Sequence, residues 1–528
     1  MRDFQLLGRS PAYGVSGMAA TSVPSATLVA LDVLRAGGNA VDAAIAAAAV
    51  LAVVEPAMTG IGGDCFALVA PASGGVFAVN GSGRAPAAAT IERLRAEGLA
   101  EIPPRSAHAV TVPGALRAWE LLLERFGTKP LAELLRPAIR LAEEGFPVTA
   151  RVAWDWRRHA STLRHSEGAA AFYLPGGRPP AEGRIVQLPA LARTLERIAT
   201  EGVNAFYEGP LAEKMVASLR SWGGVHSLED FAAQRAELVE PIHTSYRDLL
   251  VYECPPNGQG VVALQILNVL EGFELGAMEP LGAERLHLLA EAAKLAFRDR
   301  DALLADPAMV EVPVQRLLDK DYAARLRETI DPERAARDLP PPLLAAHKDT
   351  VYLCVVDRDL NVVSFINSLF EPFGSGLCCP ETGVLFHNRG VSFRLDPAHP
   401  NALGPGKRPM HTIIPALAFK GGEAWLAFGV MGGHFQPMGQ VQLLSAIVDH
   451  GLDPQAALEL PRVSAYPFDM EVERRIPAPT RAGLQERGHL VLEPSAPLGG
   501  GQAILVDRKR GVLVGGSDPR KDGLALGW

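Results

Sequence analysis

The stretch HKDTVYLCVVDRDLNVVSFINSLF, from His347 to Phe370, decides how the second part of this chain folds. It follows a proline-rich segment and contains two apolar runs, TVYLCVV and VVSFINS, joined by the polar loop DRDLN. Apolar runs that flank a short polar loop predict an antiparallel β-hairpin. If Val356 faces Val362, the antiparallel register places Thr350 opposite Ser368. Two hydroxyl groups then meet at the open end of the hairpin.

Composition and charge narrow the classes of function. The 528 residues are 48% hydrophobic and 21% charged, and the formal net charge is -8. A slightly acidic chain without a basic patch argues against nucleic acid and against an anionic membrane as partners. We therefore expect chemistry on a small molecule.

The cysteine and histidine patterns predict neither a metal nor another cofactor. Five cysteines form no CxxC pair, and the sequence contains no HExxH motif. The N-terminus lacks the apolar segment of a signal peptide, and the longest apolar run, residues 43–54, is too short to span a bilayer. These features favour a cytoplasmic location.

Hydrophobic periodicity predicts helices first and strands later. Residues 17–64 read as two closely packed helices, the second capped by Asn39, and residues 107–345 are mostly helical in pattern. After residue 345 strands and glycine turns dominate, with one helix expected from Gln440 to Asp449. This order predicts an α+β fold in which helices cover sheet layers.

A threonine that starts a buried strand just after a proline-rich linker suggests a specific chemistry. A threonine hydroxyl is a weak nucleophile unless a base lies beside it. If the Asp349–Thr350 bond is cut, Thr350 gains a free α-amine, and the ordinary pKa of such an amine, about 7.7 to 8.0, suits a general base. Taken alone, the residues also allow an ordinary strand threonine.

Several segments resemble the γ-glutamyltransferase (γ-glutamyltranspeptidase) family of N-terminal-nucleophile hydrolases, and the resemblance runs from about Gly17 to the C-terminus. The segments are AGGNAVDAAIA (36–46), VEPAMTGIGGD (54–64), VTVPGALRAW (110–119), ECPPNGQGVVALQILNVLEGF (253–273), DTVYLCVVD (349–357), GKRPMHTIIPAL (406–417), VMGGHFQPMGQ (430–440) and GGSDPR (515–520). The resemblance implies a four-layer αββα sandwich. It also implies a precursor that cleaves itself into a large subunit, residues 1–349, and a small subunit, residues 350–528. The two subunits stay associated, and a homodimer of such heterodimers is possible.

The same resemblance assigns the catalytic groups. Thr350 falls on the family's nucleophile, and Ser368 falls on a hydroxyl residue that hydrogen-bonds it. Gly432 and Gly433 fall on the glycine pair whose backbone N–H groups form the oxyanion hole. Glycines suit this place because the backbone must approach the substrate closely.

The positions that recognise the γ-glutamyl group in the family differ here. A substrate-binding arginine is replaced by Ser82, an aspartate that binds the α-ammonium by Ser392, and an asparagine by Phe370. A serine pair is replaced by His411 and Thr412. Loss of a charge-assisted hydrogen bond should weaken selection for an α-ammonium by roughly one to two orders of magnitude.

Positive groups that could bind a carboxylate on the acyl part remain at Arg84, Arg389 and His411. The pattern resembles the acylase and amidohydrolase branch of the family, which includes cephalosporin acylase-like enzymes and oxamate amidohydrolase. We therefore expect a self-processed amide hydrolase that acts on a small carboxylate-bearing amide through a threonyl acyl-enzyme. Two alternatives are a true γ-glutamyltransferase or glutathione hydrolase, and an uncleaved binding protein without catalytic activity.

Overall fold

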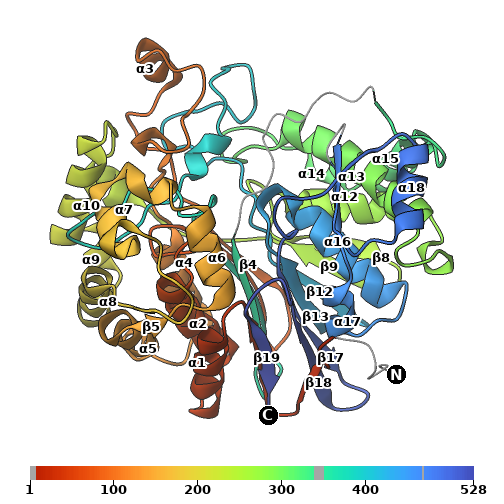
Figure 1. The fold of residues 1–528 in the computed structure, drawn as a ribbon, viewed down its shortest axis with the longest axis horizontal. Coiled ribbons are helices and arrows are strands. Elements are labelled where there is room, and N and C mark those ends of the chain that lie inside the picture. Colours follow the sequence, from red (N-terminus) through yellow and green to blue (C-terminus); the bar gives the residue numbers. More distant parts are fainter. Residues whose placement is uncertain (1–7, 338–349, 466–468) are drawn as a thin grey trace.

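Two seven-stranded antiparallel sheets form the centre of the molecule (Figure 1). The computed structural model describes residues 8–337, 350–465 and 469–528. The first sheet has the order β19 (Leu524–Gly527), β2 (Met18–Thr21), β10 (Val351–Val356), β11 (Val362–Ser368), β3 (Asp64–Ala70), β4 (Phe77–Gly81) and β7 (Glu237–Val239). The second has the order β1 (Ala12–Gly14), β18 (Val512–Ser517), β17 (Gly501–Asp507), β13 (Glu423–Val430), β12 (Ala416–Lys420), β9 (Leu249–Glu253) and β8 (Ile242–Tyr246).

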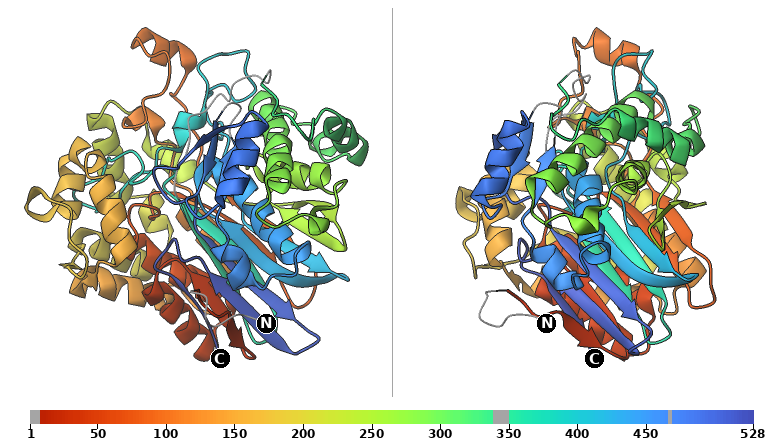
Figure 2. Two further views of the ribbon diagram at one scale, coloured as in Figure 1. Left: turned by 45° about the vertical axis from the view of Figure 1, so that its right-hand side comes forward. Right: turned by 90° about the vertical axis from the view of Figure 1, so that its right-hand side faces the viewer.

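Helices lie to either side of this pair of sheets, as Figures 1 and 2 show. On the side of the first sheet are α1 (Pro24–Arg35), α2 (Ala40–Val54), α4 (Ala115–Phe126), α5 (Leu131–Glu144), α6 (Ala150–Arg158), α7 (Glu167–Tyr173), α8 (Pro189–Glu201), α9 (Asn204–Tyr207) and α10 (Pro210–Ser221). The short α11 (Leu228–Ala233) contacts α9 and α10, and the short α3 (Ile91–Ala96) lies at the top of Figure 1, beyond the sheets. On the side of the second are α12 (Gly260–Leu270), α13 (Ala283–Leu303), α14 (Val314–Leu317), α15 (Lys320–Glu328), α16 (Gln436–Val448), α17 (Pro454–Glu459) and α18 (Ala478–Glu486). The mixture of helix and sheet expected from the sequence is confirmed.

Side chains of β10 alternate between two apolar cores, which explains its unbroken apolar sequence. Val351, Leu353 and Val355 pack in the core formed with the helices, whereas Tyr352 and Cys354 pack between the two sheets. Successive strand residues point to opposite faces, so a strand covered on both faces needs apolar residues throughout. The strand that follows Thr350 is therefore held rigidly.

The predicted hairpin register is confirmed. Val356 pairs with Val362 and Val351 pairs with Asn367, so the ladder brings Thr350 and Ser368 together at its end. The helix expected from Gln440 is correct in type but begins earlier, since α16 starts at Gln436. Pro437 lies in its first turn, where the missing N–H of a proline costs no helical hydrogen bond.

Each sheet combines strands from both sides of residue 350. In the first sheet, β10 and β11 lie between β2 and β3, and in the second, the strands from β18 to β12 lie between β1 and β9. A cut before Thr350 would therefore leave two polypeptides that share both sheets. Asp349 lies outside the described residues.

Two small sheets were not predicted from the sequence. One contains β14 (Val463–Ala465), β15 (Asp469–Val472) and β16 (Leu490–Leu492), and the other pairs β5 (Phe146–Pro147) with β6 (Ile185–Val186).

In the described part of the chain, no helix combines the length and the apolar character needed to cross a bilayer.

The contact between the two sheets is tight at Gly429, which supplies a test of the fold. A Cβ atom at this position would lie 2.5 Å from the ring of Tyr352. We expect Gly429→Ala to lower the free energy of unfolding by about 1 to 3 kcal/mol through overpacking, measured as a shift of the urea midpoint. Gly404→Ala is the matched control, because its added Cβ meets only the Lys407 side chain at 3.9 Å. Equal midpoints for the two variants would contradict the packing described here.

Candidate active site

Two buried hydroxyl groups meet where the β10–β11 hairpin opens. Thr350 Oγ1 lies 3.0 Å from Ser368 Oγ, and both residues are fully buried. Ser368 Oγ also accepts a hydrogen bond of 2.8 Å from the Phe370 backbone N–H, and Arg389 Nη2 lies 3.4 Å away. A hydroxyl oxygen has one proton and two lone pairs. With both lone pairs of Ser368 engaged, its proton points to Thr350 Oγ1 and leaves the Thr350 hydroxyl proton available to a base.

Arg389 brings a buried positive charge next to this pair. It lies in the short helix η5 (Arg389–Ser392), its side chain is fully buried, and Nη1 donates to Thr412 Oγ1 at 2.8 Å. Burial lowers the pKa of Arg389 to about 9, and the neighbouring Asp64 and Glu371 offset part of that effect. The group is still protonated at neutral pH. It is therefore suited to bind an anionic group of a substrate.

Phe370 supports the guanidinium through its ring face. The Arg389 guanidinium carbon lies 3.9 Å from the centre of the Phe370 ring, within the range of a cation–π contact. Phe370 has a φ of +77°, which is unfavourable for a residue with a side chain. Strain of this kind persists where surrounding contacts enforce it, and it gathers at functional sites.

Asp64 organises the opposite side of the site. It lies at the start of β3, directly opposite Ser368 in the ladder. Its carboxylate accepts from the Gly83 N–H at 2.9 Å and from His411 Nε2 at 2.9 Å, and His387 Nδ1 lies 3.1 Å away. Burial alone would raise the pKa of Asp64, but His387 and His411 outweigh it and hold that pKa well below its usual range.

His411 is neutral in this arrangement. Burial, together with the positive charge of Arg389, lowers the pKa of His411 to about 3. Its Nε2–H is used by Asp64, and in the described residues its Nδ1 has no hydrogen-bond partner. It therefore brings a neutral acceptor rather than the positive charge considered from the sequence.

The glycine pair lies at the turn between β13 and α16. Gly432 and Gly433 have φ angles of +123° and +57°, a backbone conformation that favours glycine. Within the described residues, neither backbone N–H donates a hydrogen bond. The pair therefore offers two N–H donors from a buried turn.

Gln259 links the glycine pair to Thr412, the residue that contacts Arg389. Its side-chain amide donates to the carbonyl oxygens of Thr412 and Gly433, both at 2.9 Å, and its oxygen accepts from Arg300 Nη1 at 2.9 Å. Thr412 is also the residue that accepts from Arg389. Sequence reasoning assigned no role to Gln259 or Asp64, although both lie in motifs that carried the family resemblance, ECPPNGQG and TGIGGD.

Two candidate binding residues lie outside this network. The Arg84 guanidinium pairs with Glu237 at 3.0 Å and with Asp306 at 3.7 Å, and it donates to the Gly406 carbonyl. Ser392 is buried, and within the described residues its Oγ has no hydrogen-bond partner. Ser82, which aligns with the substrate-binding arginine of the family, accepts a hydrogen bond of 3.0 Å from Asn257 Nδ2.

Three residues far apart in the sequence form a cluster that sequence reasoning missed. Ligand atoms of His287, Glu291 and His489 lie within 4.8 Å of one another. Lys294 donates to Glu291 at 2.7 Å and places a positive charge beside the cluster. That charge opposes binding of a metal cation.

The neutral state of His411 predicts a pH dependence of stability. Its folded pKa lies below the unfolded value of about 6.5, so the unfolded chain binds the proton first as pH falls. The contribution of neutral His411 to the free energy of unfolding is therefore complete above about pH 6.5, and it is lost as pH falls from 6.5 towards 3. We expect His411→Asn to reduce the slope of unfolding free energy against pH in this window by up to about 1.4 kcal/mol per pH unit. Denaturant unfolding at several pH values measures the slope, with His243→Asn on the surface of β8 as control. An unchanged slope in His411→Asn would contradict a neutral His411.

Comparison with known proteins identifies the family of this chain. The family described as gamma-glutamyltranspeptidase matches residues 26–528. The glutathione hydrolase-like YwrD proenzyme of Bacillus subtilis (strain 168) is 39% identical, covering 94% of this chain and 95% of that protein. The oxamate amidohydrolase proenzyme of Klebsiella pneumoniae is 36% identical, covering 97% and 98%.

Among solved structures, the cephalosporin acylase from Bacillus halodurans superposes with a TM-score of 0.93 at 42% identity, covering 100% of this chain and 99% of that one. These relatives are hydrolases, and two of them are named as proenzymes. The protein therefore belongs to the γ-glutamyltranspeptidase family.

Proposed function

We propose that this protein is an amide hydrolase that cleaves its own chain before Thr350 and then uses that threonine as its nucleophile. The observation that carries the proposal is the buried 3.0 Å contact between Thr350 Oγ1 and Ser368 Oγ, in a chain of this family. On this proposal the two sheets and their helices are the four-layer αββα sandwich of N-terminal-nucleophile hydrolases. Residues 1–349 and 350–528 become the large and small subunits.

Hydrolysis of the 349–350 bond adds water across it and frees the α-amine of Thr350. The amine takes the hydroxyl proton, and Oγ1 attacks the carbonyl carbon of the amide substrate. The N–H groups of Gly432 and Gly433 stabilise the oxyanion, a contribution of about 2.7 to 4 kcal/mol for one such donor. The C–N bond then breaks, and the ammonium returns its proton to the departing amine. Water, deprotonated by the same amine, cleaves the resulting ester and regenerates Thr350.

The charges around Arg389 favour a substrate with a carboxylate and without an α-ammonium. The carboxylates of Asp64 and Glu371 are the acidic groups whose charges raise the pKa of Arg389. Asp64 is engaged by two histidines and a backbone N–H, and Glu371 pairs with Arg105 at 3.1 Å. An α-ammonium would therefore have to displace an existing contact. An acyl group such as that of oxamate fits this site better than a γ-glutamyl group does.

Processing and activity should depend on Thr350. We expect the wild type to run on a denaturing gel as fragments of about 37 and about 19 kDa, in proportion to 349 and 179 residues of a 56.2 kDa chain. Thr350→Ala should remain one intact chain and lose activity by about 10⁴-fold or more. Thr244→Ala removes another buried threonine hydroxyl, in β8, and should still be processed. An active preparation that mass spectrometry shows to be uncut would refute the mechanism.

The choice of acyl group should depend on Arg389 rather than on Arg84. We expect Arg389→Met to lower kcat/KM for oxamate by roughly 100-fold, because a buried charged contact to the substrate carboxylate is lost. Arg84→Met should change it by less than about threefold, because Arg84 is engaged by Glu237 and Asp306. Steady-state kinetics on oxamate, a γ-glutamyl anilide and its analogue without the α-amine provide the measurement. Faster turnover of the γ-glutamyl compound would instead favour a glutathione hydrolase.

A further inference from the structure

Glu253 is a buried carboxyl group that the proposed reaction does not use. It is the last residue of β9, and its side chain is fully buried. Leu249 and Val251, which alternate with it along the strand, pack in the core between the second sheet and its helices. Within the described residues, neither Glu253 Oε1 nor Oε2 has a hydrogen-bond partner. A buried polar group without a partner is destabilising, so these two oxygen atoms need an explanation.

The helices that lie against Glu253 bring no positive charge. α12 begins at Gly260, where an added Cβ would lie 2.7 Å from Glu253 Cβ, and α16 brings Gln440 close enough to affect the pKa of the carboxyl group. Neither helix contains an ionisable side chain. The N-terminus of α12 favours an anion, but in the described part of the chain no N–H group donates to Glu253. Burial raises the pKa of Glu253 well above its usual range, and the Gln440 amide offsets only part of that effect.

The neighbouring strands do not compensate the carboxyl group either. Lys420, in β12, and Tyr246, in β8, lie at the opposite end of their ladders with β9. His243, in β8, lies opposite Tyr252, so its side chain is on the other face of the sheet from Glu253. Two further groups whose pKa values are raised by burial, and raised further by Glu253, are uncharged acids, Cys254 and Tyr352.

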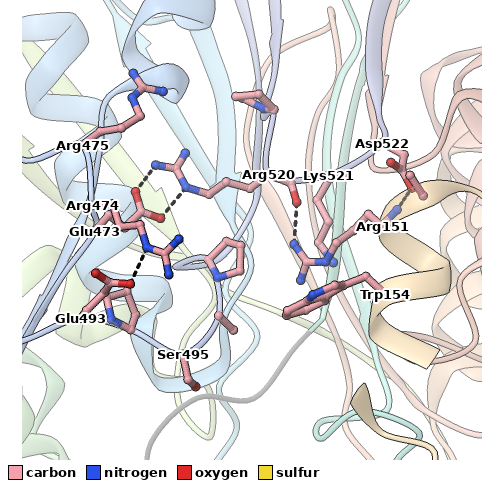
Figure 3. A pocket seen from close by; sticks show the side chains of 15 residues that line it. Arg151, Trp154, Glu473, Arg474, Arg475, Glu493, Ser495, Arg520, Lys521 and Asp522 are labelled. Carbon is pink, nitrogen blue, oxygen red and sulfur yellow. Dashed lines mark hydrogen bonds and ion pairs between the residues drawn. The ribbon is translucent and has the colours of Figure 1, made fainter. Parts of the chain in front are cut away.

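Other carboxylates of this protein have basic partners. Figure 3 shows Glu473 paired with Arg520 beside a surface pocket. Asp518 is fully buried and pairs with Arg462 at 2.6 Å. Burial alone would raise the pKa of Asp518, but Arg462 and Arg520 lower it to about 2. Glu253 has no such partner among the described residues, so a bound proton is the simplest way to remove its charge.

Gln440 connects Glu253 to both parts of the proposed active site. Gln440 Nε2 donates to the Ile414 carbonyl at 2.6 Å, and Gln436 Oε1, one turn earlier in α16, accepts the Ile414 N–H at 3.1 Å. Ile414 lies two residues after Thr412, which accepts from Arg389. α16 itself begins three residues after the glycine pair. Gln440 Oε1 is buried, and within the described residues it has no hydrogen-bond partner.

We propose that Glu253 is a neutral carboxylic acid in the folded protein and that its O–H group donates to Gln440 Oε1. One proton then supplies a partner for two buried oxygen atoms and keeps Gln440 Nε2 directed to the Ile414 carbonyl. Glu253 is thus a positioning residue. Through Gln440 it holds α16 against residues 412–414, and so holds the oxyanion donors in place relative to Arg389. Its effect on catalysis rests on the proposed function, whereas its protonation does not.

The pH dependence of stability tests the protonation without any catalysis. An unfolded glutamate releases its proton at about pH 4.3, whereas folded Glu253 keeps it, so the wild type loses stability relative to Glu253→Gln as pH rises. The folding equilibrium constant of Glu253→Gln, divided by that of the wild type, should rise by up to about 10-fold per pH unit between about pH 5 and 8. Urea unfolding measures both constants. Glu182→Gln, at an exposed side chain, is the matched control and should give a constant ratio. A constant ratio for Glu253→Gln as well would overturn the inference.

A bound cation is the other way in which these oxygen atoms could be satisfied. Urea midpoints in potassium chloride and in choline chloride of equal ionic strength distinguish a cation from a proton. We expect the difference in midpoint between wild type and Glu253→Gln to be the same in both salts. If potassium raises the midpoint of the wild type alone, the oxygen atoms hold a cation and the inference is overturned.

Kinetics on oxamate test the positioning role. Glu253→Gln keeps an N–H donor for Gln440 Oε1 and should retain kcat within about twofold. Glu253→Leu has a similar size but no donor, and it should lower kcat by about 10-fold with KM changed by less than about twofold, because Arg389 is untouched. Full activity of Glu253→Leu, or an equal loss in Glu253→Gln, would overturn the positioning role.

A double-mutant cycle shows whether Glu253 acts through Gln440. Gln440→Leu should lower kcat by about the same factor as Glu253→Leu, and the double variant should lose no more than either single variant. Independent, multiplying losses would contradict the contact. If the wild type hydrolyses no amide, the proposed function fails, and the ratio of folding constants still decides whether Glu253 is protonated.

Discussion

The contact between the hydroxyls of Thr350 and Ser368 depends on one constraint, the register of the β10–β11 hairpin. A slip of one residue would turn every side chain of β10 to the opposite face. Both faces are covered by apolar cores, and Tyr352 fits against Gly429 of the other sheet, so a slipped register would lose this packing. The rigid hairpin therefore holds the two hydroxyl groups at a fixed separation before a substrate binds.

A small number of buried charges surrounds this pair. An isolated buried ion is destabilised by several kcal/mol unless partners compensate for the lost water. Asp64 is compensated by two histidines and a backbone N–H, whereas Arg389 has neutral hydroxyls, an aromatic ring and a carboxylate only at 4.0 Å. The positive charge of Arg389 is therefore only partly compensated, and an anionic group of a substrate would compensate it further.

The presence in each sheet of strands from both sides of residue 350 explains how the fold could tolerate a break in its chain. Each sheet contains strands from both sides of residue 350, and β10 and β11 lie at the centre of the first sheet. Separating the two parts would expose the hydrogen-bonding edges and the apolar faces of both sheets at once.

The sequence by itself determined the hairpin, its register, the α+β composition and the family, because these depend on local periodicity and on ordered motifs. It also indicated Thr350, Ser368 and the glycine pair as candidates. Only the tertiary structure decided that Asp64, Gln259 and Arg300 join the same network, that Arg84 is engaged by Glu237 and Asp306, and that His411 is neutral. The reason is physical: burial and the charge on a neighbour set the state of an ionisable group, and those neighbours come from segments hundreds of residues apart.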